Sequence, residues 1–512
     1  MMIKKTLPLT VIFFIVIFNC SYLFGRESSL PEATSSDNHP TIVIDNVHDC
    51  LVEVSPLFFG ANSLYWVNDD ESRDKPELLK RLKSLKLSTL RYPGGEVADN
   101  FDWETNKLND DTAFPKSRNI NDPVTRMDFD EFITWKDKIG AKAILVVNLE
   151  NGFIERNLEE ASDHAAQWVR YANIEKRYNV RYWEIGNESY HFGTRYALTS
   201  KEYSRALKLF SRKMKAVDPS IKIGAIGPYN LDNFLTIDAL SAIELASFRS
   251  KKTITKKKKF RKQYKKKHPK DKIYPSKWWS NITKHAGESF DFAVIHRYTA
   301  ERYSKRQMHK PLQLKNNLNK ISHFLEKKLH KKIPLAVTEY NVANTKLKGI
   351  RYGLTVAEMI GNCLESRVFL SNYWPLRSKN RRALLGPTNF EKKTSFPIFK
   401  AFSKNIGDKL LHTTTSDNML YVISSMDTVK NQLALFIINK SEDIKNISLS
   451  ISSSPEQVML LNQVQEINKK HVSLHALKVP HDLRKQNVLS SDNLWAINIS
   501  ALSLTILKFK SN

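Results

Sequence analysis

Hydrophobic and polar positions follow one repeating pattern through most of this chain. Short apolar runs, typical of strands buried on both faces, are each followed by a longer segment with the periodicity of an amphipathic helix. The predicted strands lie at 57–62, 88–95, 143–148, 181–188, 221–227, 290–296, 334–341 and 367–374. The helical patterns that follow them lie at 76–86, 128–139, 158–178, 200–217, 312–329, 352–364 and near 401, with a helix and a long insert after the fifth strand.

Eight strand–helix units in a row predict a parallel sheet, and eight is the number that closes into a (β/α)8 TIM barrel. An open, doubly wound sheet is the alternative. It would usually carry a glycine-rich phosphate loop after its first strand, and Gly60-Ala61-Asn62 is not such a loop. The pattern therefore favours an α/β barrel over residues 57–405.

After about residue 408 the pattern changes to strands with little helix between them. The predicted strands lie at 420–423, 433–438, 447–451, 458–461 and 502–506. This succession is typical of an all-β sandwich, which we place at 408–512. The short strands within 41–56 need a partner sheet, so we expect them to complete this C-terminal sandwich.

The N-terminal residues 1–25 have the features of a secretory signal peptide. Lys4 and Lys5 precede an apolar run that is too short to cross a membrane. We therefore expect a secreted, periplasmic or cell-surface protein, with Cys20 as an alternative lipidation site. Removal of the signal leaves Cys50 and Cys363, which are available to pair but do not predict a metal site. We expect no metal and no cofactor.

The formal charge of +27 is concentrated in one insert at 249–272, which holds fourteen Lys and Arg and a single acid, Asp271. One interpretation is a contact for an acidic glycan or an anionic cell surface. The other is a solvated loop without a partner. We expect a mobile attachment to the barrel, because its lysines leave no apolar stripe to bury. Nucleic acid is not an expected partner, since nothing nearby resembles a nucleic-acid-binding fold.

Two glutamates occupy corresponding places in the pattern. Glu188 ends the fourth predicted strand beside Asn187, and Glu339 ends the seventh strand near Asn341. Catalytic residues of parallel barrels lie at the carboxyl ends of the strands. Two carboxylates placed there can face each other across a sugar and cleave its glycosidic bond.

The motifs around these residues resemble the retaining glycoside hydrolases of clan A, and most of all the α-L-arabinofuranosidases of family 51. The resemblance extends from about residue 57 to 376. Its most specific motif is the one from Trp183 to Glu188. The motifs are Trp183-Glu184-Ile185-Gly186-Asn187-Glu188, Leu90-Arg91-Tyr92-Pro93-Gly94-Gly95 with Trp103-Glu104, Val147-Asn148-Leu149, Ile295-His296-Arg297-Tyr298 and Thr338-Glu339-Tyr340-Asn341.

The resemblance implies a role for each site residue. Glu188 is expected to be the general acid and base and Glu339 the nucleophile. The remaining expected contacts with the substrate or the nucleophile are Arg91, Asn148, Asn187, His296, Tyr298 and Trp374. We expect Glu184 to lie deeper in the barrel with a hydrogen-bond partner.

Three features depart from the family pattern. Glu96 stands where an Asn is usual, Glu150-Asn151-Gly152 replaces a different turn, and the basic insert is foreign to the family. These departures leave the identity of the substrate sugar undecided. The alternatives are an endo-glycosidase or a glucuronidase or heparanase-like enzyme of the same clan acting on acidic or sulfated glycan. A non-catalytic carbohydrate-binding surface protein is the alternative of another class.

Overall fold

A computed structural model of the chain describes most of residues 39–511. The described ranges are 39–45, 52–109, 126–194, 196–251, 254–268, 277–343, 345–452, 459–469, 475–477 and 493–511. The proposed signal peptide, Cys20 and Cys50 lie outside these ranges. Cys363 is buried and carries a free thiol.

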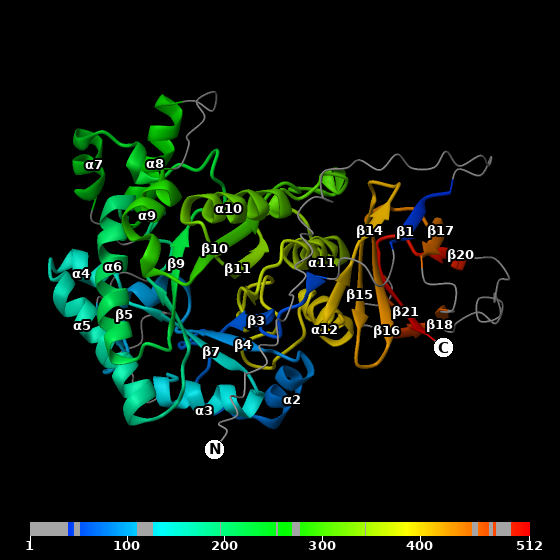
Figure 1. The fold of residues 1–512 in the computed structure, drawn as a ribbon, viewed down its shortest axis with the longest axis horizontal. Helices are drawn as coiled ribbons and strands as arrows, with labels where there is room; N and C mark the ends of the chain where they lie inside the picture. The colour runs from blue at the N-terminus through cyan, green and yellow to red at the C-terminus, as the bar shows by residue number, and fades with distance from the viewer. Residues whose placement is uncertain are drawn as a thin grey trace, which may run out of the picture. The chain divides into compact units, whose positions relative to one another are not determined.

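Eight parallel strands close into a barrel in the order β10-β11-β12-β3-β4-β7-β8-β9, which confirms the predicted (β/α)8 fold (Figure 1). In chain order the strands are β3 (Phe59–Asn62), β4 (Thr89–Tyr92), β7 (Lys142–Val147), β8 (Tyr182–Ile185), β9 (Lys222–Gly227), β10 (Phe292–Thr299), β11 (Leu335–Val342) and β12 (Leu370–Tyr373). The strands are short and almost wholly buried, as expected for a sheet that is covered on its outer face and filled on its inner face.

Helices connect consecutive strands of the barrel, and the last helix follows the eighth strand and precedes the sandwich. They are α1 (Asp70–Arg73), α2 (Pro76–Ser84), α3 (Phe129–Ile139), α4 (Glu150–Ile154), α5 (Leu158–Val169), α6 (Ser200–Val217), α7 (Ala242–Arg249), α8 (Ile254–Lys267), α9 (Trp278–Ala286), α10 (Leu314–Leu329), α11 (Gly349–Glu365) and α12 (Ser395–Asn405). Local sequence sets several of their ends. Thr199 and Glu202 form a capping box at the start of α6, and Gly140 in a left-handed conformation ends α3. A small hairpin of β5 (Phe101–Asp102) and β6 (Lys107–Leu108) follows β4.

The C-terminal part is a sandwich of two sheets, as predicted. One sheet has the order β14-β1-β17-β20 and the other the order β19-β18-β21-β16-β15-β13-β2. The strands after α12 are β13 (Lys409–Leu411), β14 (Thr413–Thr415), β15 (Leu420–Asp427), β16 (Gln432–Asn439), β17 (Lys445–Ile451), β18 (Met459–Ile467), β19 (His475–Leu477), β20 (Asn493–Ile499) and β21 (Ser503–Ser511). Apolar side chains of both sheets form a core of their own.

Both N-terminal strands pair with strands of the sandwich. Strand β1 (Thr41–Ile44) lies between β14 and β17, and β2 (Val52–Glu53) pairs with β13 at the edge of the larger sheet. The chain thus contributes two strands to the sandwich before it enters the barrel.

The basic insert is not the mobile attachment that we expected from its sequence. Residues 254–267 form the helix α8, in which Lys257 and Tyr264 are buried and Phe260 is half-buried. These positions lie three to four residues apart and form the apolar stripe that the sequence seemed to lack. A lysine occupies one position of this stripe, because the aliphatic part of its side chain can be buried, and the hydrophobic pattern of the sequence therefore does not show the stripe. No helix in the described part of the chain is both long and apolar enough to cross a membrane.

Candidate active site

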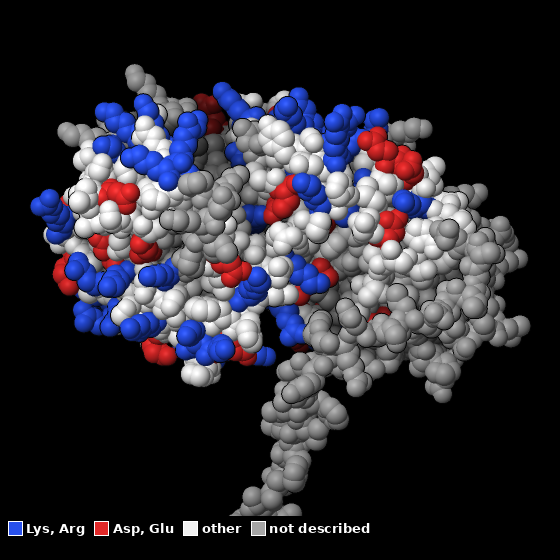
Figure 2. All heavy atoms as spheres, turned by 90° about the horizontal axis from the view of Figure 1, so that it is seen from above, with Lys and Arg blue, Asp and Glu red and all other residues white. Residues whose placement is uncertain are grey.

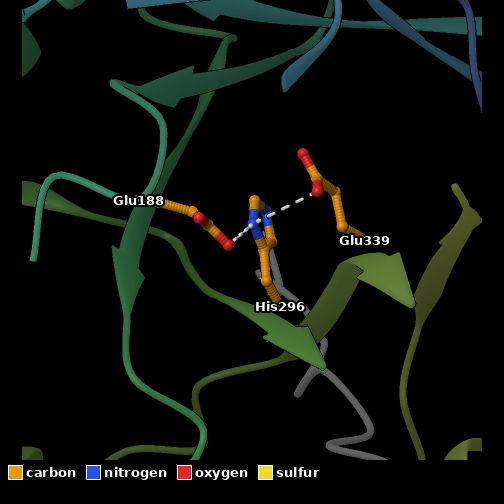
Figure 3. A group of neighbouring side chains, drawn as sticks. All are labelled: Glu188, His296 and Glu339. Atoms are coloured by element: carbon orange, nitrogen blue, oxygen red, sulfur yellow. Dashed lines mark hydrogen bonds and ion pairs between the residues drawn. The ribbon is translucent and has the colours of Figure 1, made fainter. Parts of the chain in front are cut away.

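The two glutamates lie at the same end of the barrel and face each other. Glu188 follows β8, the fourth barrel strand, and Glu339 lies in β11, the seventh, as the sequence predicted. One oxygen of each carboxyl and one ring nitrogen of His296 lie within 4.8 Å of one another. Figure 3 shows the imidazole of His296 between the two carboxyl groups.

A sharp turn of the backbone brings Glu188 into the site. Gly186 has a φ of +73°, and a Cβ there would lie 2.8 Å from the hydroxyl of Ser189. Glu188 itself has a φ of +47°, a conformation that is unfavourable for a residue with a side chain and that recurs at functional sites. Asp99 holds the turn, since its Oδ2 accepts a 2.7 Å hydrogen bond from the backbone N–H of Asn187.

A β-bulge brings Glu339 into the site. In the pairing of β10 with β11, Ile295 lies opposite Val337 but the next residue, His296, lies opposite Glu339. Thr338 is the extra residue. Successive side chains of a regular strand point to opposite faces, whereas a bulge re-aims them. Because of the bulge, the Thr338 hydroxyl and the Glu339 carboxyl both lie near the His296 ring.

Arg91 connects most of the site. Its buried guanidinium donates from Nη1 to Glu339 Oε1 at 3.0 Å, from Nη2 to Asn187 Oδ1 at 2.9 Å and from Nε to Glu184 Oε2 at 2.9 Å. Nη1 also donates to Asn62 Oδ1 at 3.0 Å. The predicted partner of Glu184 is thus confirmed. These bonds fix the orientation of both the proposed nucleophile and the amide next to the proposed acid.

The surroundings of Glu339 act on its pKa in opposite directions. Burial raises this pKa, and the negative charge of Glu188 adds to the rise. His296, the Arg91 guanidinium and the Tyr298 hydroxyl act to lower it. Tyr298 donates to Glu339 Oε2 at 2.7 Å, so each oxygen of Glu339 accepts one hydrogen bond. The resulting pKa is above that of an ordinary glutamate.

His296 is neutral at physiological pH, because burial lowers its pKa to about 4. The hydroxyl of Thr338 lies 3.2 Å from Nε2, and Glu188 Oε1 lies 3.1 Å from Nδ1. A neutral ring satisfies both contacts when Nε2 accepts from Thr338 and Nδ1–H donates to Glu188. His296 thereby orients the carboxyl of Glu188.

Two of the residues singled out in the sequence lie further from the carboxylates. The amide of Asn148 donates to the backbone oxygen of Phe101 at 3.3 Å and accepts from the N–H of Asn151 at 3.3 Å. The partly exposed ring of Trp374 packs against Gly95, where an added Cβ would lie 2.5 Å from the indole. Their contacts with substrate, like those of Asn187, stay predictions.

Four other residues belong to the site but were not singled out in the sequence. Asn62 and Thr338 are polar residues within buried strands, which is a signal that could have been used. Asp99 lies in a short 3-10 helix (Gly95–Asn100) and His191 lies in a loop, and no local pattern separates them from other polar residues of such segments. The N–H of His191 donates to the backbone oxygen of Glu188 at 2.6 Å.

The carboxylates and the imidazole are also donor types that can bind a divalent cation. Both oxygens of Glu339, however, are occupied by hydrogen bonds from Arg91 and Tyr298. Donors of that kind keep a carboxylate ionised and oriented, as a nucleophile requires. The set of partners therefore favours a catalytic pair of carboxyl groups over a metal centre.

Fold and site together define a class: barrels with a carboxylate pair on strands four and seven, as in retaining glycoside hydrolases. Comparison with known proteins gives a more particular likeness. Residues 81–269 match the family model of the alpha-L-arabinofuranosidase 1 domain, a segment that contains Glu188 but not Glu339.

Individual relatives carry the same name. Alpha-L-arabinofuranosidase C of Emericella nidulans is 27% identical over 185 residues, which cover 32% of this chain and 35% of that protein. The intracellular exo-alpha-(1->5)-L-arabinofuranosidase of Halalkalibacterium halodurans is 28% identical over 174 residues, 31% of this chain and 34% of that protein. The matched segment thus spans about a third of the length of these relatives.

A solved structure extends the likeness in fold to almost the whole chain. The GH51 alpha-L-arabinofuranosidase of Thermotoga petrophila superposes with a TM-score of 0.65 and 17% identity, covering 92% of this chain and 99% of that one. The chain is therefore similar to alpha-L-arabinofuranosidases in sequence over residues 81–269 and to a GH51 member in fold over almost its whole length.

Proposed function

We propose that the protein is a retaining glycoside hydrolase that releases α-L-arabinofuranosyl residues from a polysaccharide or oligosaccharide. The observation that carries the proposal is the distance between the carboxyl groups of Glu188 and Glu339, whose nearest oxygens lie within 4.8 Å. Retaining enzymes need about 5–5.5 Å between their carboxyl groups, whereas inverting enzymes need about 6.5–9.5 Å to admit a water. The likeness to arabinofuranosidases supports the choice of sugar.

In the first step, an oxygen of Glu339 attacks the anomeric carbon as the bond to the leaving oxygen breaks. Glu188 donates its proton to that oxygen, so the leaving group departs as a neutral alcohol. Arg91 and Tyr298 hold Glu339 ionised and aimed before the attack. The product of this step is a covalent glycosyl ester on Glu339.

In the second step, the ionised Glu188 takes a proton from water, and the water oxygen attacks the anomeric carbon. The ester bond to Glu339 breaks, the carboxylate is regenerated, and the sugar leaves with its original anomeric configuration. Arg91 donates to the Asn187 side chain and holds it next to Glu188, and we expect this amide to hydrogen-bond a sugar hydroxyl in both steps.

The test is hydrolysis of 4-nitrophenyl α-L-arabinofuranoside followed by proton NMR. We expect turnover with the α-anomer of arabinose formed first. A first-formed β-anomer would exclude the retaining mechanism. No turnover of any aryl glycoside in a panel would favour the non-catalytic, carbohydrate-binding alternative.

A second candidate is favoured by the charge of the chain. An endo-glycosidase or a glucuronidase-like enzyme acting on acidic glycan would suit the cationic insert, which supports contact with an anionic polymer or cell surface. Release of arabinose from neutral aryl glycosides distinguishes the first candidate from this one, since a glucuronidase requires a carboxylate on the sugar that it cleaves.

We also propose that the enzyme acts outside the cytoplasm. The sequence of residues 1–25 supports this proposal. Fractionation of cells that express the full chain, compared with a chain lacking these residues, tests it: only the full chain should leave the cytoplasm.

A further inference from the structure

Helix α8 of the basic insert packs beside the loop that carries Glu188. Tyr264 and Phe260 of α8 contact an apolar cluster that contains Phe192 and Phe248, and the Tyr264 hydroxyl donates to the backbone oxygen of Ala239 at 3.1 Å. Phe192 follows Glu188 by four residues. The position of α8 is therefore fixed relative to the proposed acid.

Arg261 connects α8 to this loop directly. Its Nη1 lies 3.1 Å from Nε2 of His191, and its guanidinium lies 6.0 Å from the ring centre of Phe192. His191 in turn donates its backbone N–H to the backbone oxygen of Glu188. Lys258, one turn earlier, packs against the same loop, because its Cε lies 3.0 Å from where a Cβ of Gly193 would stand.

Neither of these two cations forms an ion pair with a described carboxylate, and the negative charge of Glu188 acts on Arg261 only from a greater distance. In the described part of the chain, no carboxylate oxygen lies within 4.0 Å of Arg261 or Lys258, whereas nearby Arg249 is paired with Glu202 at 2.7 Å. Arg261 is half-buried, and burial lowers its pKa. A guanidinium that is partly removed from water with no carboxylate in direct contact is costly, so an external anion bound to Arg261 would stabilise this arrangement.

The retaining mechanism indicates which part of a bound substrate would lie near Arg261 and Lys258. The nucleophile attacks the face of the sugar opposite the leaving group, and the acid protonates the leaving oxygen. The leaving group therefore lies on the Glu188 side of the scissile bond, away from Glu339. The loop after Glu188, with α8 beside it, borders that side. Figure 2 shows Lys and Arg side chains spread over the face seen from above, with one group toward the left, where α7 and α8 lie in Figure 1.

We propose that Arg261 and Lys258 form a subsite for an acidic group of the glycan on the leaving-group side of the scissile bond. The acidic group is a carboxylate or a sulfate ester, both of which accept hydrogen bonds from guanidinium and ammonium groups. This inference rests on the proposed function, since it assumes that Glu188 is the acid. It assigns the cationic insert to the selection of substrates rather than to general adhesion.

The test compares one polymer in two forms. The probe is a pectic polysaccharide with α-L-arabinofuranosyl side chains, used as such and after chemical reduction of its uronic carboxyl groups to alcohols. The variant is Lys258→Gln with Arg261→Gln, which keeps polar side chains at both positions. The control is Lys259→Gln with Lys266→Gln, which removes the same charge from exposed positions on another face, about 120° around the helix.

We expect the wild-type enzyme to have a higher kcat/KM for the acidic than for the reduced polymer. This preference should fall about tenfold in the Lys258/Arg261 variant, the effect of losing a hydrogen bond to a charged group, and should persist in the control. Added salt should weaken the preference, because partly exposed charges are screened. Sulfation of the reduced polymer shows which anion the subsite binds. If sulfation restores the preference, the subsite binds sulfate esters. If it does not, the subsite is specific for carboxylates.

Three results would overturn the inference: no preference in the wild type, the same loss in the control variant, or no loss in the Lys258/Arg261 variant. The single variant Lys258→Gln, at an exposed position, provides the same comparison if the double variant does not fold. Affinity electrophoresis in gels that contain the acidic polymer measures binding without turnover. Loss of binding in the variant with no hydrolysis by the wild type would refute the proposed function and leave the anion subsite intact.

Discussion

Glu188 and Glu339 are the same residue type in different surroundings, and this difference assigns their roles. The Glu339 side chain is 6% exposed and each of its oxygens accepts a hydrogen bond, from Arg91 and from Tyr298. The Glu188 side chain is 19% exposed and is held by the imidazole of His296. The first environment suits a fixed nucleophile. The second suits a group that exchanges protons with a leaving group and then with water.

The proposed roles predict different behaviour of the two alanine variants. Glu339→Ala should abolish turnover of every substrate, and azide should not restore the retained product. Glu188→Ala should lose about 10²–10⁴-fold on substrates with poor leaving groups, the usual contribution of a general acid. It should lose far less on 2,4-dinitrophenyl glycosides, whose leaving group needs no proton. Steady-state kinetics over a series of leaving groups measures these losses. Similar losses in both variants would contradict the assignment of acid and nucleophile.

The pKa of Glu339 predicts the acid limb of the pH profile. A nucleophile must be ionised, so activity is lost as the pH falls through the pKa of Glu339, which lies above that of an ordinary glutamate. The Tyr298 hydroxyl lowers this pKa, so Tyr298→Phe should move the acid limb of kcat/KM to higher pH. An acid limb that stays in place or moves to lower pH would show that another group controls it. His296, with a pKa of about 4, is not expected to control it at neutral pH.

At the scale of elements, two departures from regular structure place the chemistry. The left-handed turn at Gly186 and Glu188 and the bulge at Thr338 re-aim side chains at the strand ends. Helix α8 then covers apolar residues on the loop after β8. Helix α8 is therefore part of the folded barrel, and its removal would expose the cluster around Phe192 and Phe248.

Substitution within α8 tests this packing. Tyr264 is 7% exposed and its ring and hydroxyl both have partners. Tyr264→Ala should destabilise α8 by about 3–5 kcal/mol, as for other large buried aromatic side chains. Limited proteolysis with trypsin, which cuts at the many lysines of α8, should become faster. Gln263→Ala, at the exposed neighbouring position, is the control. Equal cleavage rates in the two variants would show that α8 is not held by Tyr264.

At the scale of the whole molecule, barrel and sandwich share buried contacts. The rings of Phe402 in α12 and Phe436 in β16 stack with their centres 4.6 Å apart. Glu358 of α11 accepts from Arg302 at 2.6 Å and lies 3.5 Å from the ammonium of Lys440, which follows β16. All three charged residues are buried. The two parts therefore should unfold together.

Substitution of Glu358, which contacts both Arg302 and Lys440, tests whether barrel and sandwich unfold together. Glu358→Gln leaves Arg302 and Lys440 buried without a counter-charge, a change that costs about 3–5 kcal/mol. Calorimetry should show one transition at a lower temperature. The matched control is Glu442→Gln, which removes one partner of the exposed pair with Arg351 and should have little effect. Two separate transitions in the wild type would show that barrel and sandwich fold independently.

The sequence by itself determined the architecture and the chemical pair. The order of strands and helices follows from hydrophobic periodicity and from local signals such as the capping box of Thr199 and Glu202, which are readable in a short window. That order places Glu188 and Glu339 on strands four and seven, because consecutive units of a barrel are neighbours in space. The motif from Trp183 to Glu188 added the likeness to arabinofuranosidases.

The tertiary structure alone decided which other residues reach the carboxylates and what the basic insert does. Asp99 and Thr338 act through a loop contact and a bulge, neither of which has a period in the sequence. The apolar surface that α8 covers belongs mainly to residues 192–248, so the sequence of the helix does not show what its few apolar side chains pack against. Whether a lysine or arginine is neutralised depends on distances between distant segments, and a count of charges along the chain cannot contain that information.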